Sequence, residues 1–295
     1  MNSTERMLLS LQGLSVGDAF GERCFDYAFT DLRKIEDRVL PPTPWPYTDD
    51  TEMALSIVDV LRRIGRIDPD ALAQAFAARY DAMRGYGGGA HRLLQKLQRG
   101  ADWRVEAPAM FGGSGSYGNG GAMRVAPLGA FFADDLDAVI ENAALSALPT
   151  HAHPEGQAGA IAVALGAALA CRVAEGEKLT PQEFLTAIAE RCPATETKEG
   201  ISAAAELRPQ TTSRQAAGIL GSGNHVSAQD TVPFALWSAA HHLHDYADAL
   251  WTTASGLGDI DTTCAMVGGI VALSAMANGI PASWLTTREP LPEGF

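Results

Sequence analysis

Residues Thr48 to Thr51 place two carboxylates, Asp49 and Asp50, at the predicted start of a helix. Prolines before them hold the approach extended, and an apolar run at helical spacing begins at Met53. Thr and Asp in this position are typical of a helix N-cap. A second cluster of Asp and Thr, Gly258 to Thr263, also opens a predicted helix far along the chain. The chain therefore has two acidic helix starts.

Either acidic cluster alone is explained by capping, because Asp and Thr accept hydrogen bonds from free N–H groups and complement the helix dipole. A cap needs only one acceptor, whereas each cluster gathers several hard oxygens, which suit Mg²⁺, Mn²⁺ or Ca²⁺ better than zinc. If the fold brings the clusters together, four carboxylates and some threonine oxygens could hold two ions roughly 3.5–4 Å apart, as in bimetallic hydrolases.

Apolar residues at helical spacing, separated by short polar turns, recur along the rest of the chain. No segment shows convincing period-2 alternation, and no internal repeat has a fixed period. Since no linker is visible, the sequence predicts an all-α, compact single domain over residues 1–295. Beyond the segment from Ser3 to Leu14 and the helix from Thr48 to Ile64, we expect helices at Ala71 to Met83, Ala90 to Gln98, Leu136 to Ala147, Gln157 to Val173, Pro181 to Arg191, Lys198 to Leu207, Thr231 to His242, Tyr246 to Ser255 and Cys264 to Met276.

Charge and cysteine content exclude some classes of function. With 22 basic and 35 acidic residues the net charge is −13 and no basic block is present, which disfavours nucleic-acid binding.

The apolar stretches Ala158 to Ala170 and Ala265 to Ala277 are rich in small residues, and we expect buried helices below membrane-spanning length. No signal peptide is recognisable. We expect a cytoplasmic monomer that does not bind a membrane, with reduced thiols at Cys24, Cys171, Cys192 and Cys264.

The longest glycine-rich stretch runs from Phe111 to Gly121 and precedes Ala122-Met123-Arg124. It matches neither a dinucleotide fingerprint nor a P-loop. It could be a flexible connector, or its consecutive N–H groups could form an anion nest suited to a pyrophosphate. Ser116, Tyr117 and Asn119 could then contact a ribose or an adenine. The His151-x-His153 pair could bind metal, but a capping or solvated role is more common for such histidines.

Six motifs in this order resemble the ADP-ribosylglycohydrolase family and span residues 17 to 262. They are Gly17-Asp18-Ala19-Phe20-Gly21, Tyr47-Thr48-Asp49-Asp50-Thr51, Arg84-Gly85-Tyr86-Gly87, Ser116-Tyr117-Gly118-Asn119-Gly120-Gly121-Ala122-Met123-Arg124, Thr150-His151 and Gly258-Asp259-Ile260-Asp261-Thr262. The resemblance implies an all-α bundle with two Mg²⁺ or Mn²⁺ ions in a central cleft.

The resemblance also implies roles for individual residues. The implied metal ligands are Thr48, Asp49, Asp50, Asp259, Asp261 and Thr262. The implied contacts to the diphosphate and adjoining ribose come from Ser116, Tyr117, Gly118, Asn119 and Gly120, with His151 and the Gly87-Gly88-Gly89 loop lining the same groove.

One position departs from the family pattern. Many members place a Glu seven residues after the aspartate of the Gly-Asp motif, and Phe25 stands there in this chain. Glu22, four residues after Asp18, is the candidate for that role, while Asp26 lies eight residues after it. The implied reaction is attack of an activated water at C1″ of the distal ribose, with Asp261, Asp50 or Glu22 as general base.

The resemblance thus implies a metal-dependent hydrolase that removes ADP-ribose from modified proteins or small molecules. Other functions stay open: a non-catalytic sensor of ADP-ribose or nucleotides on the same fold, and a hydrolase for another ribosyl or guanidine-like substrate. A structural or scaffolding role is the least favoured, because so many polar residues cluster at helix starts. The sequence leaves open whether the bond cleaved joins ADP-ribose to arginine, serine, a base or a metabolite.

Overall fold

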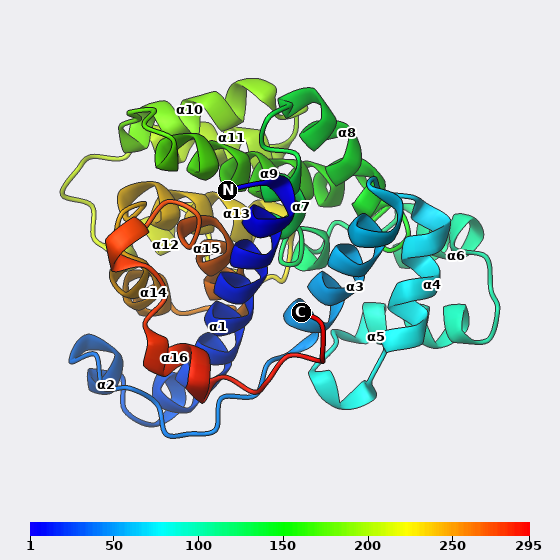
Figure 1. Ribbon diagram of the computed structural model, residues 1–295, viewed down its shortest axis with the longest axis horizontal. Helices are drawn as coiled ribbons and strands as arrows, with labels where there is room; N and C mark the ends of the chain where they lie inside the picture. The colour runs from blue at the N-terminus through cyan, green and yellow to red at the C-terminus, as the bar shows by residue number, and fades with distance from the viewer.

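The computed structural model describes the backbone of residues 1–295 and all side chains except that of Ala277 (Figure 1). The chain forms α-helices joined by short loops, with only two isolated backbone bridges among the described residues, so the all-α prediction is confirmed. The helices are α1 (Ser3–Thr30), α2 (Arg33–Glu36), α3 (Asp49–Ile64), α4 (Pro69–Arg79), α5 (Gly88–Gln98), α6 (Trp103–Gly113), α7 (Ala126–Phe131), α8 (Leu136–Ala147), α9 (Pro154–Ala174), α10 (Pro181–Arg191), α11 (Glu196–Ala205), α12 (Ser213–Leu220), α13 (Ala228–His241), α14 (Tyr246–Ser255), α15 (Ile260–Val271) and α16 (Ala282–Thr287), with 3₁₀ turns η1 (Ala82–Arg84), η2 (Asn119–Gly121) and η3 (Met276–Asn278).

Helices α1 and α15 form the closest helix pair, because glycines recur every four residues on one face of α1. A Cβ atom on Gly13, Gly17 or Gly21 would lie only 2.1–2.5 Å from a carbonyl oxygen of α15. The helices are antiparallel, since Gly13 meets Gly268 and Gly21 meets Ile260. This contact sets the start of α15 beside the middle of α1, where Asp18 lies.

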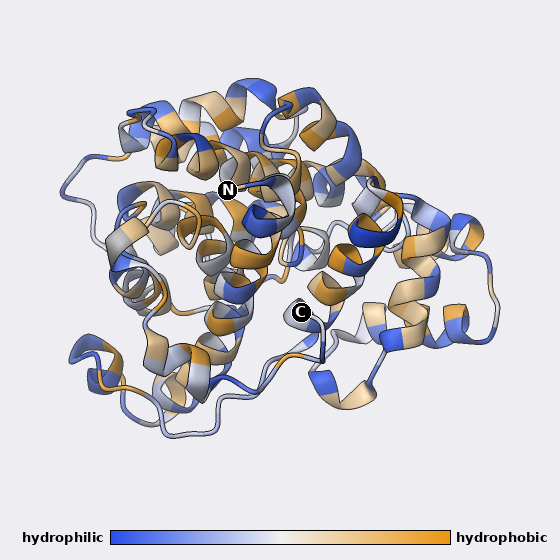
Figure 2. Ribbon diagram, in the orientation of Figure 1, coloured by the Kyte–Doolittle hydropathy of each residue, from blue (hydrophilic) through white to orange (hydrophobic). Residues whose placement is uncertain are grey.

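Helix α9 is the core helix on the other side of the molecule and packs against α7, α8 and α13. Figure 2 shows its apolar residues lying within the bundle. At 21 residues it is long and apolar enough to cross a membrane, and 83% of its most apolar window is buried within the protein. The prediction that this stretch falls short of spanning length is therefore wrong, while its burial is as predicted. The burial predicted for Ala277 lies outside the described side chains.

Several helix boundaries differ from the predicted ones for reasons of tertiary contact. Helices α8, α10 and α14 begin and end at the predicted residues. Helix α1 continues to Thr30, since the glycines at 17 and 21 pack on α15 rather than ending the helix. Helix α15 begins at Ile260 and ends at Val271, earlier than predicted at both ends. Helices α2, α6, α7, α12 and α16 were not predicted.

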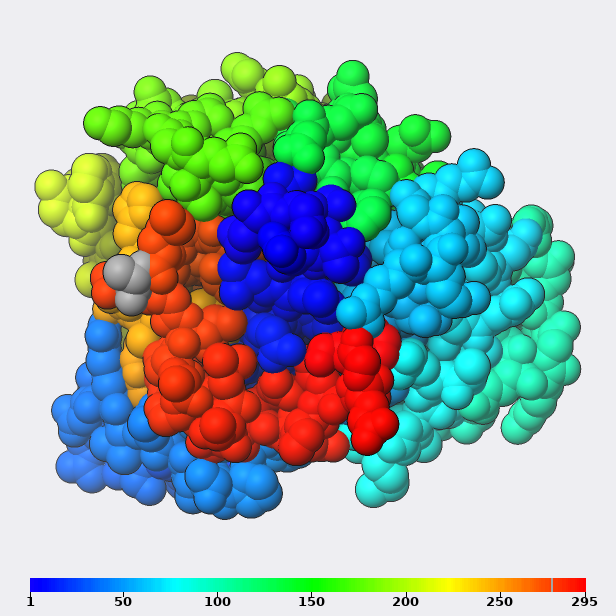
Figure 3. Space-filling model, in the orientation of Figure 1, coloured from blue at the N-terminus to red at the C-terminus, as the bar shows by residue number. Residues whose placement is uncertain are grey.

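The C-terminal segment fixes the proline-rich approach to α3. Trp45 N donates to Thr287 O at 3.2 Å, and Glu289 N donates to Trp45 O at 2.8 Å. Arg84 bridges the same region, because it binds the Glu289 carboxylate at 2.7 and 2.8 Å and donates to Tyr47 O at 3.0 Å. Figure 3 shows this segment running across the surface between α1 and the lobe formed by α4, α5 and α6. The segment before Thr48 is therefore held by the C-terminal segment at Trp45 and by Arg84 at Tyr47.

Candidate active site

Asp18 fastens the start of α3 to the middle of α1. Its carboxylate is fully buried and accepts hydrogen bonds from the backbone N–H groups of Thr48 and Thr51, each at 3.0 Å. The hydroxyl groups of the same two threonines donate to it at 2.8 and 2.5 Å. Asp18 thus caps α3 from another helix and fixes the position of Asp49 and Asp50. The sequence placed Asp18 in a motif of the family that the chain resembles, but it did not predict this anchor.

We expect Asp18→Ala to lower the free energy of unfolding by about 3 kcal/mol or more, because it leaves two buried N–H groups and the Thr51 hydroxyl without acceptors, while the Thr48 hydroxyl keeps only Asp50 Oδ2 at 3.1 Å. Urea unfolding in the presence of chelator measures this value. Asp68→Ala is the matched control, since Asp68 caps α4 by accepting from two N–H groups near the surface. Its expected cost is about 1 kcal/mol. Equal costs for the two variants would contradict the anchoring role of Asp18.

The structure brings the two acidic helix starts together. Burial, and next the charges of Asp18 and Asp261, raise the pKa of Asp50 well above its ordinary value. The charges of Asp49 and Asp259 act in the same direction. Electrostatic repulsion of this kind needs short separations. Thr262, at the same helix start as Asp261, is buried beside it. All six predicted metal ligands therefore lie in one region, between the starts of α3 and α15.

The donor atoms of this cluster fit a divalent cation with hard-oxygen preference. One carboxylate oxygen of Asp50 and one of Asp261 are buried and accept no hydrogen bond within the described part of the chain. Buried, unpaired carboxylate oxygens are costly unless a cation or donor meets them. No three His, Cys, Asp or Glu side chains among the described residues gather closely enough to hold an ion by themselves. Mg²⁺ suits such an arrangement, because it needs few carboxylates and retains several waters.

The raised pKa values of the buried carboxylates predict how the stability of the metal-free protein depends on pH. Burial raises the pKa of Asp49 to about 7 and that of Asp18 to about 6, with repulsion from Asp18 adding to the effect at Asp49. An Asp in the unfolded chain has a pKa of about 3.9.

We expect Asp49→Asn to stabilise the metal-free protein relative to wild type by an amount that grows between about pH 4 and pH 7. Below pH 4 Asp49 is protonated in both states, and above it the folded state binds more protons than the unfolded state, so wild-type stability falls as pH rises. Urea unfolding of both proteins in chelator gives the difference directly. A difference that does not change with pH would show that Asp49 has no raised pKa.

Asn119 links the second acidic cluster to the glycine-rich loop. Its side-chain amide donates to Asp259 Oδ2 at 2.7 Å and to Thr231 Oγ1 at 3.1 Å. Asp259 N donates to Ser222 O at 2.9 Å, and a Cβ on Gly223 would lie 2.3 Å from the Cβ of Asp259. The loop between α12 and α13, residues 221–227, therefore supports Asp259. This loop was not predicted from the sequence, although its Gly221-Ser222-Gly223 segment is typical of a tight backbone turn.

Residues 115–121, the later part of the glycine-rich loop predicted from Phe111 to Gly121, lie against the start of α9. Ser116 Oγ accepts from Gly118 N at 3.2 Å, which folds the loop back on itself. A Cβ on Gly118 or Gly120 would lie 3.3 or 3.1 Å from Nε2 of His151, so the absence of side chains lets the loop cover the imidazole. Ser116 and Asn119 are buried, whereas Gly118 and Gly120 are half-buried. His151 and residues 115–121 thus form one wall of the candidate site.

Two exposed aromatic rings stand beside this loop. The rings of Phe111 and Tyr117 are 6.2 Å apart at 35°, and Tyr117 also meets the edge of His153 at 5.5 Å. Exposed rings at this spacing leave faces free for a flat ligand. Phe111 was not predicted as a site residue, because its placement depends on a sharp kink in α6 where its φ is 53°.

Gly87 and Gly88 form the start of α5 close to the carboxylates. Gly87 is the N-cap, and no side chain caps the helix. A Cβ on Gly85 would lie 4.0 Å from Asp49 Oδ1, and one on Gly89 would lie 3.3 Å from the ring of Phe111. The free N–H groups at this helix start therefore lie between the acidic cluster and the aromatic pair, where an anionic group could accept from them.

Glu22 lies one turn beyond Asp18 on α1 and is half-buried. Burial and repulsion from Asp26 raise its pKa, and its charge in turn contributes to the raised pKa of Asp261. Glu22 is therefore near the acidic cluster. The two histidines of the His-x-His pair have separate roles: His153 caps α9 by accepting from Glu155 N at 3.1 Å, and His151 faces the glycine-rich loop.

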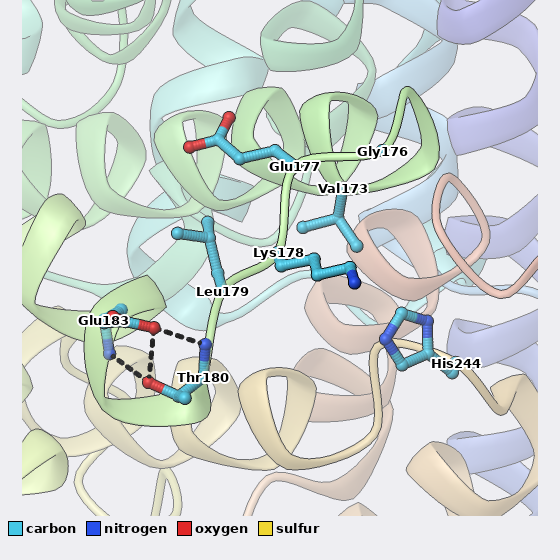
Figure 4. Close-up of a pocket in the computed structure, with 8 residues that line it drawn as sticks. All are labelled: Val173, Gly176, Glu177, Lys178, Leu179, Thr180, Glu183 and His244. Carbon is cyan, nitrogen blue, oxygen red and sulfur yellow. Dashed lines mark hydrogen bonds between the residues drawn. The ribbon is translucent and has the colours of Figure 1, made fainter.

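A separate hollow of about 590 Å³ lies beyond the end of α9 (Figure 4). Figure 4 shows Lys178 directed toward His244 and Glu177 directed away from it. Thr180 and Glu183 bind each other there as the capping box of α10. No residue of the acidic cluster lines this hollow. Size alone therefore does not make it the site of chemistry.

The features described above are a helical bundle and an acidic cluster between the starts of α3 and α15, beside a glycine-rich loop. The sequence profile of the ADP-ribosylglycohydrolase family matches residues 1–293, and the chain belongs to this family. ADP-ribosylhydrolase ARH3 of Xenopus tropicalis is 32% identical, with 95% of this chain and 90% of that protein aligned. ARH3 of Homo sapiens is 30% identical, with 99% and 91% aligned.

A solved structure described as an ADP-ribosylglycohydrolase-related protein complex has the same fold. It superposes with a TM-score of 0.62 at 22% identity, covering 98% of this chain and 93% of that chain. The resemblance to the family is therefore confirmed over nearly the whole sequence. Family membership supports hydrolysis of ADP-ribosyl groups as the general class of activity.

Proposed function

We propose that this protein is a divalent-cation-dependent hydrolase that releases ADP-ribose from modified proteins or small molecules by cleaving the bond at C1″ of the distal ribose. The observation that carries the proposal is the meeting of Asp50 and Asp261, from opposite ends of the chain, in a buried cluster with unpaired oxygens. The substrate class comes from the family and from relatives named ADP-ribosylhydrolase.

Thr48, Asp49, Asp50, Asp259, Asp261 and Thr262 would hold two Mg²⁺ ions, with Mn²⁺ as a possible substitute. When bound, such ions supply positive charge that orients ribose hydroxyls and lowers the pKa of water. Asp18 supports metal binding by these residues. Its buried carboxylate accepts four hydrogen bonds from Thr48 and Thr51, and these hold the start of α3, with its carboxylates, beside α15. These hydrogen bonds thus stabilise an arrangement in which several carboxylates repel one another.

ADP-ribose would lie along the wall formed by the loop 115–121 and the start of α5. The free N–H groups at Gly88 and the loop amides suit a diphosphate. The exposed rings of Phe111 and Tyr117 suit the adenine, since stacking on aromatic rings is favourable for any base. This placement directs the distal ribose toward Asp49, which neighbours Gly85 at the other end of the wall.

Side chains of this protein would accept and transfer the protons of the reaction. Asp261, Asp50 or Glu22 takes a proton from the attacking water, which forms a bond to C1″ while the glycosidic bond breaks. The leaving group then takes a proton and departs with the bonding electrons. A raised pKa suits a general base, because it brings proton affinity closer to the working pH.

A second candidate function is a non-catalytic sensor of ADP-ribose on the same fold. The observation that favours it is Phe25, which stands on the continuous helix α1 where many family members place Glu. The nearness of Glu22 to Asp261 favours the hydrolase instead.

The test is release of ADP-ribose from proteins modified on arginine or on serine and from small ADP-ribosyl compounds, in Mg²⁺ and in chelator. Glu22→Gln is compared with Glu141→Gln, since Glu22 adds to the raised pKa of Asp261, whereas Glu141 is exposed on α8 and lies outside the acidic cluster. We expect metal-dependent release from at least one substrate, slowed by Glu22→Gln alone. Tight ADP-ribose binding with no release from any substrate would support the sensor.

A further inference from the structure

A cation without an ion-pair partner lies beneath the loop 115–121. Arg124 is fully buried, and no carboxylate within the described residues forms a salt bridge with it. Its guanidinium lies 4.3 Å above the ring of Phe76 and donates to Ser146 O at 3.1 Å and to Thr150 Oγ1 at 2.7 Å. Burial lowers its pKa to about 9, so it remains charged at neutral pH. A buried, unpaired charge is costly, which indicates a role beyond packing.

Thr150 connects this cation to the wall of the site. A guanidinium has only donors, so the oxygen of Thr150 accepts from Arg124. The hydroxyl hydrogen of Thr150 then has two candidate acceptors, Nδ1 of His151 at 2.8 Å and Ala147 O at 3.4 Å. The shorter distance favours donation to His151 Nδ1.

Donation to Nδ1 determines where the imidazole carries its own hydrogen. Burial, and next the charge of Arg124, lower the pKa of His151 to about 3, so the ring is neutral. A neutral imidazole that accepts at Nδ1 carries its hydrogen on Nε2. Nε2 faces Gly118 and Gly120, where the described residues offer it no hydrogen-bond partner.

We propose that Arg124 is a positioning residue that acts through Thr150 to hold His151 in the Nε2–H form, so that the wall presents a neutral hydrogen-bond donor to a phosphate-bearing ligand. Only the identity of that ligand rests on the proposed function. The hydrogen-bond chain itself is a property of the free protein.

The test is nitrogen NMR of protein labelled at histidine, because the two tautomers of a neutral imidazole have opposite patterns of nitrogen shifts. His151→Gln assigns the signal. We expect the Nε2–H pattern in the free wild-type protein. Thr150→Val removes the hydroxyl at nearly constant shape, and we expect mixed tautomers and about tenfold weaker ADP-ribose binding. Thr150→Ser keeps the hydroxyl and should restore both.

An Nδ1–H pattern in wild type would overturn the inference even if Thr150→Val fails to fold. An unchanged tautomer and unchanged affinity in a folded Thr150→Val would overturn it as well. Failure of the proposed function is distinguishable from either, since a protein that binds no ADP-ribose would still report its tautomer.

Discussion

Asp261→Asn is expected to reduce ADP-ribose release by about a thousandfold or more, because the variant loses both a ligand oxygen charge and a candidate general base. The same change should make the metal-free protein more stable at neutral pH. Burial and the charges of Asp259 and Asp18 raise the pKa of Asp261, so its ionised form is disfavoured in the folded state. Removal of that charge relieves the repulsion. Opposite effects on activity and stability are the signature of a carboxylate placed for function rather than for folding.

The measurement pairs initial rates of release in Mg²⁺ with urea unfolding in chelator. Asp137→Asn is the matched control, because Asp137 is an exposed aspartate in the first turn of α8 and lies outside the acidic cluster. We expect it to leave both quantities within experimental error of wild type. Retention of more than about a tenth of the activity by Asp261→Asn would remove Asp261 from the proposed chemistry.

Gly17→Ala is expected to lower the free energy of unfolding by about 3 kcal/mol or more, a large effect for one methyl group. The new Cβ would lie 2.1 Å from Cys264 O, which belongs to the backbone of α15 and has no side-chain freedom to move away. The two helices must therefore separate. Because Asp18 lies on α1 and Asp261 on α15, this separation should also weaken Mg²⁺ binding.

Gly218→Ala is the control for the same chemical change. Gly218 is exposed within α12, and a Cβ there meets no atom within 4 Å. Since Ala favours a helix over Gly, we expect a gain of about 0.5–1 kcal/mol. Urea unfolding of both variants decides the matter. A loss for Gly17→Ala no larger than about 1 kcal/mol would mean that the α1–α15 contact is looser than the structure has it.

Local signals explain which helices could be predicted from the sequence. Helix α10 opens with Thr180 and Pro181 and carries its capping partner Glu183 within the same turn, so its start is set by neighbouring residues. Helix α3 likewise begins after Thr48, whose side chain caps it at Asp50 N. Such contacts involve residues close in sequence, and a pattern can therefore reveal them.

The parts that were missed depend on distant residues. The start of α15 is set by Ser222, which accepts from Asp259 N, and no local pattern records that contact. Phe111 reaches the site through a kink with positive φ, which is unusual for a phenylalanine. The motifs could place Asp50 and Asp261 at helix starts, but the glycines of α1 that bring these starts together become informative only once their partner helix is known.

Calorimetric titration of the metal-free protein with Mg²⁺, repeated in buffers of different ionisation enthalpy, tests the central claim most directly. We expect binding of two ions per chain with release of protons, because Mg²⁺ competes with protons for carboxylates whose pKa values are raised. Both ions should be lost or greatly weakened in Asp50→Asn. Absence of saturable Mg²⁺ or Mn²⁺ binding, or binding that Asp50→Asn leaves intact, would contradict a divalent-cation site between α3 and α15.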